Sequence, residues 1–335
     1  MTILITGGAG FIGSHIAAQL LVNDVDFVIV DNLSNSDRQN LNSLQWFFKK
    51  EIKFEHFDIR EVERMQEVFE DHQVTSVIHC ASLKSVGESI NQPIHYEKNN
   101  VDGSRVLVEL AKSFNVQKFI FSSSACVYGE PKYLPIDETH RLSPVSPYGQ
   151  NKMVIEDMLR KDPYFDSHCR TIIFRYFNPI GSFGDGLIGE IPRGTPNNLM
   201  PYILGVVNQD YSHLRIFGND YQTTDGTAVR DYIHIMDLVD AHIVALQDKT
   251  LGLSTFNVGT GNGISVNEII DSFKAINGVE VPCQVEARRA GDVASCYADN
   301  KKIIQQLSWR PNRSLNQMCR DAYLFARTIR MRNDK

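Results

Sequence analysis

The stretch MTILITGGAGFIGSHIAAQLLVNDVDFVIVD, residues 1–31, decides the fold of this chain. A β-rich apolar run at Thr2–Thr6 is followed at once by a glycine-rich turn at Gly7–Gly13, and the pattern from Ser14 onward predicts a helix. A second apolar run then ends in Asp31. This order of strand, turn, helix, strand and carboxylate is typical of a βαβ unit that binds a dinucleotide.

Each glycine of the turn has its own task in such a unit. Gly7 permits the tight turn, Gly10 lets a pyrophosphate approach the backbone, and Gly13 lets the helix pack close to the strand. The pyrophosphate would lie on free N–H groups at the positive end of the helix. Asp31 is placed to accept hydrogen bonds from the adenosine ribose and to repel a 2′-phosphate, which favours NAD over NADP.

Composition limits the classes of protein to consider. The 335 residues are 42% hydrophobic and 22% charged, as in soluble globular proteins. A net charge of −6 argues against a nucleic-acid surface. No apolar run reaches ~18 residues, so we expect no membrane span, and the early strand leaves no room for a signal peptide. Six scattered cysteines without a C-x-x-C predict reduced thiols, no metal site and a cytoplasmic location.

Apolar strands alternate with helical patterns through the first half of the chain, which predicts an α/β fold with a doubly wound parallel Rossmann sheet. Strands are expected at residues 52–57, 74–80, 118–121 and 170–176, and helices at 62–71, 93–114 and 152–160. We assign residues 1–178 to an NAD-binding Rossmann domain. Residues 179–335 are assigned to a smaller C-terminal α/β domain that binds the substrate, with the part near 231–250 a candidate to pack back on the first domain.

Polar and small residues follow the predicted strands. Ligands of doubly wound sheets bind beyond the carboxyl ends of the strands. The residues at these ends are Asp31, Asp58, Ala81, Ser122–Ser124 and Phe177–Asn178. We therefore expect them to share one site.

Tyr148 and Lys152 form a Y-x-x-x-K pattern, and helical spacing places both side chains on one face. A tyrosine with a pKa of ~10 is a weak base at neutral pH. A nearby ammonium and an oxidised nicotinamide would favour the phenolate and lower that pKa. A tyrosine packed on a lysine stem is the alternative. Because the pattern follows a dinucleotide unit and a serine-rich strand end, we predict a catalytic set of Ser124, Tyr148 and Lys152.

Further motifs extend along almost the whole chain. They are the glycine turn, Asp31–Ser36 (DNLSNS), Ser122–Gly129 (SSSACVYG), Ser146–Gly149 (SPYG), Tyr176–Pro179 (YFNP), Asn197–Pro201 (NNLMP) and Asp225–Tyr232 (DGTAVRDY). Together they resemble the UDP-galactose 4-epimerases, which also include UDP-glucose/UDP-N-acetylglucosamine 4-epimerases and are extended members of the short-chain dehydrogenase/reductase family. The spacing G-x-x-G-x-x-G of the turn fits that family.

The resemblance implies a tightly bound NAD+ and no metal. Tyr148 would take the proton of the sugar 4-hydroxyl while a hydride leaves C4, and the 4-keto sugar would turn over and be reduced on its other face. The resemblance also implies a homodimer that pairs through helices near residues 93–114 and 146–160. Val101, Val106, Leu107 and Leu110 offer more apolar surface than one helix face needs, which agrees with such pairing.

The resemblance assigns ligand contacts residue by residue. Beyond the glycines, cofactor contacts fall on Phe11, Ile12, Asp31, Asn32, Asn35, Ser36, Asp58, Ile59, Ala81, Lys84, Asn99, Tyr148, Lys152 and Phe177. Contacts with the UDP-sugar fall on Ser124, Tyr148, Asn178, Asn198, Leu199, Phe217, Arg230, Arg289, Asp292 and Cys296. Arginines suit a diphosphate, and an amide or carboxylate can bind uracil or ribose.

Cys296 bears on which sugar is accepted. In the family, the fourth residue after the aspartate matching Asp292 lies beside C2 of the sugar, and a bulky tyrosine there is associated with exclusion of N-acetylated sugars. The small Cys296 therefore predicts that UDP-glucose/galactose and their N-acetylated counterparts are both accepted. A slip of one residue in this register would place Tyr297 at the gate and reverse the prediction.

Three other functions compete with epimerisation. Sugar 4,6-dehydratases resemble T-D-E-V-Y-G where this chain has SACVYG at Ser124–Gly129, so both carboxyl groups of the elimination step are missing. A non-enzymatic dinucleotide sensor would lack the tyrosine or the lysine. A net oxidoreductase with exchangeable NAD stays open, and release of NAD only on denaturation would count against it.

Overall fold

The computed structural model describes residues 2–289 and 291–333. Its main-chain contacts divide the chain into two units. Unit 1 contains the residues up to 130, 141–176 and 239–256, and unit 2 contains 131–140, 177–238 and the residues from 257 onward. Residues 239–256, part of the segment marked as a candidate to return to the first domain, belong to unit 1.

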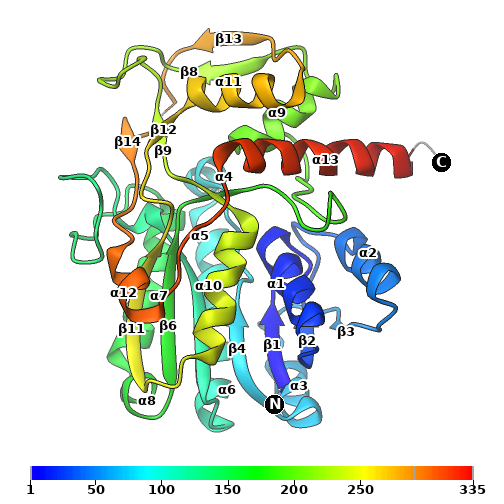
Figure 1. Cartoon of the computed structure of the whole chain (residues 1–335). Helices are drawn as coiled ribbons and strands as arrows, with labels where there is room; N and C mark the ends of the chain where they lie inside the picture. Colours follow the sequence, from blue (N-terminus) through cyan, green and yellow to red (C-terminus); the bar gives the residue numbers. More distant parts are fainter. Residues whose placement is uncertain (1, 290, 334–335) are drawn as a thin grey trace. The chain divides into compact units, whose positions relative to one another are not determined.

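Unit 1 is built on a seven-stranded sheet with the order β11-β6-β5-β4-β1-β2-β3 (Figure 1). The strands are β1 (Thr2–Thr6), β2 (Phe27–Val30), β3 (Lys53–Glu55), β4 (Val74–His79), β5 (Lys118–Ser124), β6 (Arg170–Tyr176) and β11 (Gly252–Val258). The pairs β3–β2, β2–β1, β1–β4, β4–β5 and β5–β6 are all parallel. The predicted α/β Rossmann fold is confirmed. Strands β2 and β3 follow on one side of β1 and strands β4, β5 and β6 on its other side, so the order in which strands are added changes direction at β1.

Helices cover both faces of this sheet (Figure 1). The helices of unit 1 are α1 (Phe11–Val22), α2 (Gln39–Phe48), α3 (Val62–His72), α4 (Val86–Asn91), α5 (Pro93–Glu97), α6 (Gly103–Ser113), α7 (Pro147–Lys161), α8 (Pro163–Ser167) and most of α10 (Ile235–Gln247). On one face, buried residues of β1, β4 and β5 pack with those of α3, α6, α7 and α8. On the other face α10 lies against β6, where the rings of Phe174 and His242 are 5.1 Å apart. Successive side chains of a strand point to opposite faces of the sheet, so each strand contributes apolar side chains to the packing on both faces.

Three boundaries differ from the sequence prediction. Helix α7 begins at Pro147, because the Ser146 hydroxyl caps it by accepting from the Gly149 N–H at 3.2 Å. The helix expected at 93–114 is interrupted by a π-helical turn, η1 (Lys98–Asp102). Strand β5 extends to Ser124 and is followed by a short 3-10 turn, η2 (Ala125–Val127).

Unit 2 contains three small sheets, with the orders β10-β7, β12-β9-β14 and β13-β8. Its strands are β7 (Asn178–Ile180), β8 (Leu214–Phe217), β9 (Val229–Arg230), β10 (Tyr232–His234), β12 (Ile264–Ser265), β13 (Cys283–Glu286) and β14 (Ser295–Cys296). Its helices are α9 (Leu199–Val207), α11 (Val266–Asn277), α12 (Lys301–Leu307) and α13 (Leu315–Asn333). A separate apolar core joins α9, α11 and α13 to β8.

A capping box between Ser265 and Glu268 begins α11. The Ser265 hydroxyl accepts from the Glu268 N–H, and the Glu268 carboxylate accepts from the Ser265 N–H at 2.7 Å. Within residues 2–289 and 291–333, no helix combines the length and apolar character needed to span a membrane.

Candidate active site

The glycine turn between β1 and α1 has no room for a side chain at Gly7 or Gly13. Gly7 has φ +70°, and a Cβ there would lie 2.6 Å from the Ala81 nitrogen. A Cβ on Gly13 would lie 2.4 Å from the Gly7 carbonyl oxygen. Gly10 is the N-cap of α1 and supplies no side-chain cap. The first N–H groups of the helix, from Phe11 and Ile12, are therefore available to an anion such as a pyrophosphate.

Asp31 connects the loop after β2 to the glycine turn. Its buried carboxylate accepts hydrogen bonds from the Ala9 N–H at 3.0 Å, the Leu33 N–H at 2.8 Å and the Ser36 hydroxyl at 2.9 Å. A carboxylate offers about four acceptor positions. One position is thus left for a ribose hydroxyl.

Asp58 lies beyond β3 and is held in its charged form. It accepts two hydrogen bonds of 2.8 Å from the Arg60 guanidinium and one of 2.8 Å from the Asn32 amide. The Arg60 hydrogen bond is the main reason why the pKa of Asp58 falls to about 2. The Asn35 amide donates to the Ser82 carbonyl at 3.3 Å. These contacts order the loops where an adenosine would bind, and the neighbouring Ile59 is buried.

A buried chain of hydrogen bonds, which sequence reasoning missed, supports Ala81. Ser104 donates to the Asn100 carbonyl at 2.6 Å, so its oxygen accepts from His79 Nε2 at 2.7 Å. His79 Nδ1 then accepts from the Thr6 hydroxyl at 2.8 Å, and the Thr6 oxygen accepts from the Ala81 N–H at 3.4 Å. Burial is the main cause that lowers the pKa of His79 to about 3, so the imidazole is neutral.

The π-helical turn places Asn100 against the loop after β4. The Asn100 amide accepts from the Leu83 N–H at 2.8 Å and donates to the Leu83 carbonyl at 3.1 Å. Asn99, the predicted contact, is the half-buried residue before it, and Lys84 is exposed. Two successive asparagines inside a helical pattern are a signal that could have marked this turn, because asparagine disfavours helix interiors.

The predicted catalytic set is brought together in unit 1. Ser124 ends β5, Tyr148 lies in the first turn of α7, and Lys152 follows one turn later. The Ser124 hydroxyl accepts from the Cys126 N–H at 3.2 Å and lies near enough to Tyr148 to lower its pKa. Lys152 Nζ donates to the Ser122 carbonyl at 2.8 Å and lies 5.7 Å from the centre of the Tyr148 ring. The ammonium therefore lies over the face of the Tyr148 ring.

Burial controls the ionisation of this set. It is the main cause that raises the pKa of Tyr148 above its ordinary value, while the nearby Ser124 hydroxyl lowers it. Burial also lowers the pKa of Lys152 to about 8. The expected lowering of the Tyr148 pKa is thus not present in the protein alone. A bound oxidised nicotinamide would add the positive charge that the phenolate requires.

Unit 2 gathers four of the predicted substrate contacts. Asp292 accepts two hydrogen bonds from the Arg289 guanidinium, at 3.1 and 3.0 Å, and lies 4.0 Å from Arg230 Nη2. The Arg289 guanidinium lies 5.3 Å from the centre of the Phe217 ring. Ala290, the next residue in the sequence after Arg289, lies outside the described residues. Two cations, a carboxylate and an aromatic ring form a cluster suited to an anionic nucleotide.

The register of β14 separates Cys296 from Tyr297. Cys296 pairs with Arg230 in the parallel β14–β9 pair, so the two side chains share a face. Tyr297 points to the other side, where a Cβ added to Gly263 would lie 2.8 Å from its ring. The face that carries Arg230 therefore carries Cys296 and not Tyr297.

The remaining predicted contacts in unit 2 lie on other elements. Asn178 is exposed on β7, and its N–H donates to the Asp231 carbonyl at 2.9 Å. Asn198 is the exposed N-cap of α9, donates to Glu190 at 3.2 Å, and precedes the half-buried Leu199. Phe177 is buried.

Asp231 has a structural role that its motif did not indicate. Its buried carboxylate accepts from the Thr260 N–H and hydroxyl, each at 2.7 Å, from the Gly261 N–H at 2.9 Å and from the Ala298 N–H at 3.1 Å. These bonds fix the segment that leads out of β14. In the part of the chain that the structure describes, no group of three or more His, Cys, Asp or Glu residues is placed to hold a metal ion.

Comparison with known proteins gives consistent matches along the chain. A family model described as the NAD dependent epimerase/dehydratase family matches residues 3–259. A UDP-glucose 4-epimerase of Neisseria gonorrhoeae is 46% identical over 326 residues, covering 96% of each chain. A UDP-glucose 4-epimerase from Stenotrophomonas maltophila, crystallised with NAD and formylated UDP-arabinopyranose, superposes with a TM-score of 0.95 at 40% identity over 99% of each chain. The UDP-Glc/GlcNAc 4-epimerase of Campylobacter jejuni gives 0.83 at 35% identity, covering 98% of this chain and 99% of that one.

Proposed function

Because this chain belongs to the NAD dependent epimerase/dehydratase family, we propose that it is a UDP-hexose 4-epimerase that acts on both plain and N-acetylated UDP-sugars. The observation that carries the proposal is the cluster of Ser124, Tyr148 and Lys152 at the carboxyl end of β5. A base, a hydroxyl and a buried ammonium are what proton transfer at a sugar hydroxyl requires.

Unit 1 has the features needed to hold NAD. The uncapped start of α1 suits the pyrophosphate, Asp31 has one acceptor position left for a ribose, and Asp58 with Asn32 lines the loops beyond β3. When bound, NAD+ would accept a hydride from C4 of the sugar and later return it to the opposite face.

Tyr148 would perform the proton transfers. Its phenolate would take the proton of the 4-hydroxyl as the C4–H bond breaks, which leaves a 4-keto sugar. The same phenol would give the proton back after the sugar has turned over, so one cycle leaves the enzyme unchanged. Ser124 would hold the reacting oxygen, and the Lys152 charge would favour the phenolate.

The cluster around Asp292 supports a UDP-sugar as the substrate. Arg230 and Arg289 can bind the two phosphate groups through paired hydrogen bonds, and Asp292 can then accept from a ribose hydroxyl or from uracil. We assign Phe217, Asn178, Asn198 and Leu199 to the same ligand. Cys296, on the face of Arg230, leaves volume for an acetamido group, and the relative from C. jejuni is named for both sugar types.

The proposal is tested with four substrates. Purified protein is incubated with UDP-glucose, UDP-galactose, UDP-N-acetylglucosamine or UDP-N-acetylgalactosamine, and the anomeric proton signals are followed by NMR without added cofactor. We expect each sugar to reach equilibrium with its C4 epimer, and NAD to appear in solution only after denaturation. A stoichiometric demand for added NAD would indicate a net oxidoreductase instead.

We propose that the active form is a homodimer that pairs through exposed apolar side chains. Val101, Leu107 and Leu110 are buried in the core of unit 1, so they offer no surface to a partner. Val106 is only partly buried. Exposed apolar side chains lie at Ile90 on α4, Ile94 on α5 and Val154 on α7, and the last two fall in the segments near residues 93–114 and 146–160.

The proposed dimer can be tested by measuring the mass of the particles in solution. Light scattering at micromolar concentration should give about twice the 37.9 kDa of the chain. Ile94→Glu should produce monomers, because a buried charge at the interface costs several kcal/mol. Trp46→Glu on α2, which removes another exposed apolar side chain, should leave the dimer intact. Particles of monomer mass from the unmodified protein would contradict the dimer.

A further inference from the structure

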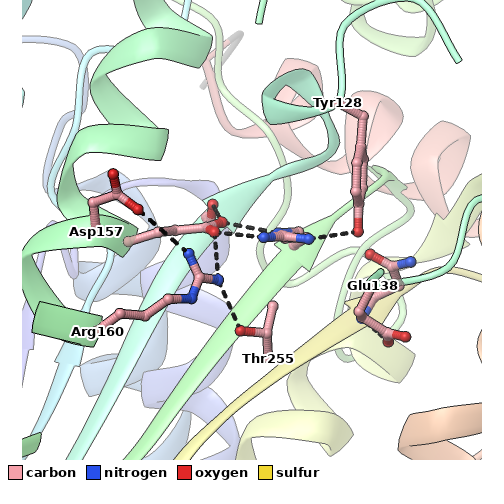
Figure 2. Close-up of polar contacts among 9 residues, drawn as sticks. Tyr128, Glu138, Asp157, Arg160 and Thr255 are labelled. Atoms are coloured by element: carbon pink, nitrogen blue, oxygen red, sulfur yellow. Dashed lines mark hydrogen bonds and ion pairs between the residues drawn. The ribbon is translucent and has the colours of Figure 1, made fainter. Parts of the chain in front are cut away.

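A buried ion pair joins α7 to β6, and Figure 2 shows the polar contacts around it, with Tyr128, Arg160 and Thr255 labelled. Glu156 on α7 and Arg175 on β6 are almost completely inaccessible to solvent. Arg175 Nε and Nη2 donate to the two Glu156 oxygens at 3.0 and 2.6 Å, and Arg175 Nη1 donates to the Tyr128 hydroxyl at 2.9 Å. From the outside, Arg160 donates to Glu156 at 2.8 Å and to Thr255 at 3.0 Å.

The same carboxylate contacts the strand end that carries the catalytic serine. The Ser123 hydroxyl donates to Glu156 Oε1 at 2.5 Å. Ser123 lies between Ser124 and Ser122, whose carbonyl accepts from Lys152. Glu156 is also one helical turn after Lys152 on α7. One side chain thus links the end of β5 to the helix that carries the base and the ammonium.

Packing alone does not explain a buried pair of this kind. Taking two charges out of water costs several kcal/mol each, and well-packed apolar residues often stabilise a core equally well. The pair is better explained by what it orients. A serine at a strand end and a tyrosine on a helix must be held within a fraction of an ångström for proton transfer.

We propose that Glu156 is a positioning residue of the catalytic set, which fixes the end of β5 against α7 through Ser123 and places a negative charge one helical turn from Lys152. The proposal rests on the proposed function and names a residue that acts through others.

The charges around Lys152 support the electrostatic part. The titratable groups that influence it are His79 and Cys80 at the end of β4, Cys126 in η2, and Tyr148 and Glu156 on α7. Burial keeps His79 neutral by lowering its pKa, and keeps Cys80 neutral by raising its pKa to about 11. Burial likewise raises the pKa of Tyr148. Glu156 is a carboxylate at neutral pH, because the hydrogen bond and the charge of Arg175 lower the pKa of Glu156 against the effect of burial.

The sign of the effect follows from this arrangement. Burial lowers the pKa of Lys152 to about 8, and the Glu156 charge opposes that shift. Loss of the Glu156 charge, with both arginines still present, lowers the Lys152 pKa further. Activity that depends on the ammonium would then be lost at a lower pH as the pH rises.

The test compares two matched charge losses on α7. Glu156→Gln should move the alkaline limb of the kcat–pH profile down by about 1 unit, which is the lower range for a close opposite charge. Asp157→Asn removes the adjacent carboxylate, which is half exposed and 3.5 Å from Lys161, and should leave the limb in place. Ser123→Ala should lower kcat about tenfold without moving the limb or KM, because the link is lost and the charge stays.

An NMR titration of Lys152, which does not depend on enzyme activity, tests the role of Glu156 independently of the proposed function. NMR of ¹³C-lysine-labelled protein, with Lys152→Met used to assign the signal, should show the Lys152 titration shifted down by about 1 unit in Glu156→Gln. A lowered melting temperature with no shift of the limb or of the NMR titration would mean that Glu156 is merely structural. An unchanged kcat in Ser123→Ala would overturn the positioning part. Absence of epimerisation in the unmodified protein would refute the proposed function, while the NMR titration would still test the charge.

Discussion

Replacing Tyr148 by phenylalanine should lower kcat for UDP-glucose epimerisation by at least ~10²-fold, the smaller end of what a general base contributes. The ring of Tyr148 packs with Leu83 and Tyr96, and phenylalanine keeps that packing. The substitution removes the oxygen that lies near Ser124 and would take the proton of the 4-hydroxyl. The loss should therefore fall on kcat, with the fold and the bound NAD unchanged.

The measurement is the initial rate with UDP-galactose, together with the NAD released on denaturation. Tyr164→Phe serves as a matched control, because its hydroxyl donates to the Val116 carbonyl, just before the start of β5 and at the other end of that strand from Ser124. That variant should retain the rate of the unmodified protein within about threefold. A folded, NAD-loaded Tyr148→Phe protein with undiminished turnover would remove Tyr148 from the mechanism.

Replacing Cys296 by tyrosine should abolish epimerisation of the N-acetylated pair and spare UDP-glucose and UDP-galactose. Cys296 shares the face of Arg230 in the β14–β9 pair, so a phenol ring would fill the volume that an acetamido group needs. Overpacking of a filled site costs ~1–3 kcal/mol or more, which corresponds to ~10- to 200-fold in rate. We expect a change of specificity rather than of stability.

The test is the ratio of kcat/KM for UDP-N-acetylglucosamine to that for UDP-glucose. Cys283→Tyr adds the same ring at an exposed position on β13 and should leave this ratio unchanged. Tyr297→Ala tests the other register, in which Tyr297 itself would be the gate. If Cys296→Tyr converts UDP-N-acetylglucosamine at the original rate, the specificity is determined elsewhere.

The sequence by itself determined the fold class and the residues at the carboxyl ends of the strands that are predicted to bind the dinucleotide. Gly7, Gly13 and Asp31 act through local geometry, since a tight turn, a close helix and a strand-end carboxylate need only residues near in sequence. The pairing of Tyr148 with Lys152 is equally local, because helical spacing alone aligns them. These features could be predicted from one chain.

Only the tertiary structure decided the rest, because it depends on which strands and helices become neighbours. Glu156 and Arg175 are 19 residues apart and meet because α7 packs over the β5–β6 pair. Thr6, His79 and Ser104 join through adjacent strands and α6, and the burial that makes His79 neutral exists only in the folded chain. The pairing of β14 with β9 likewise placed Cys296 and not Tyr297 beside Arg230, since a shift of one residue would reverse the face of each side chain.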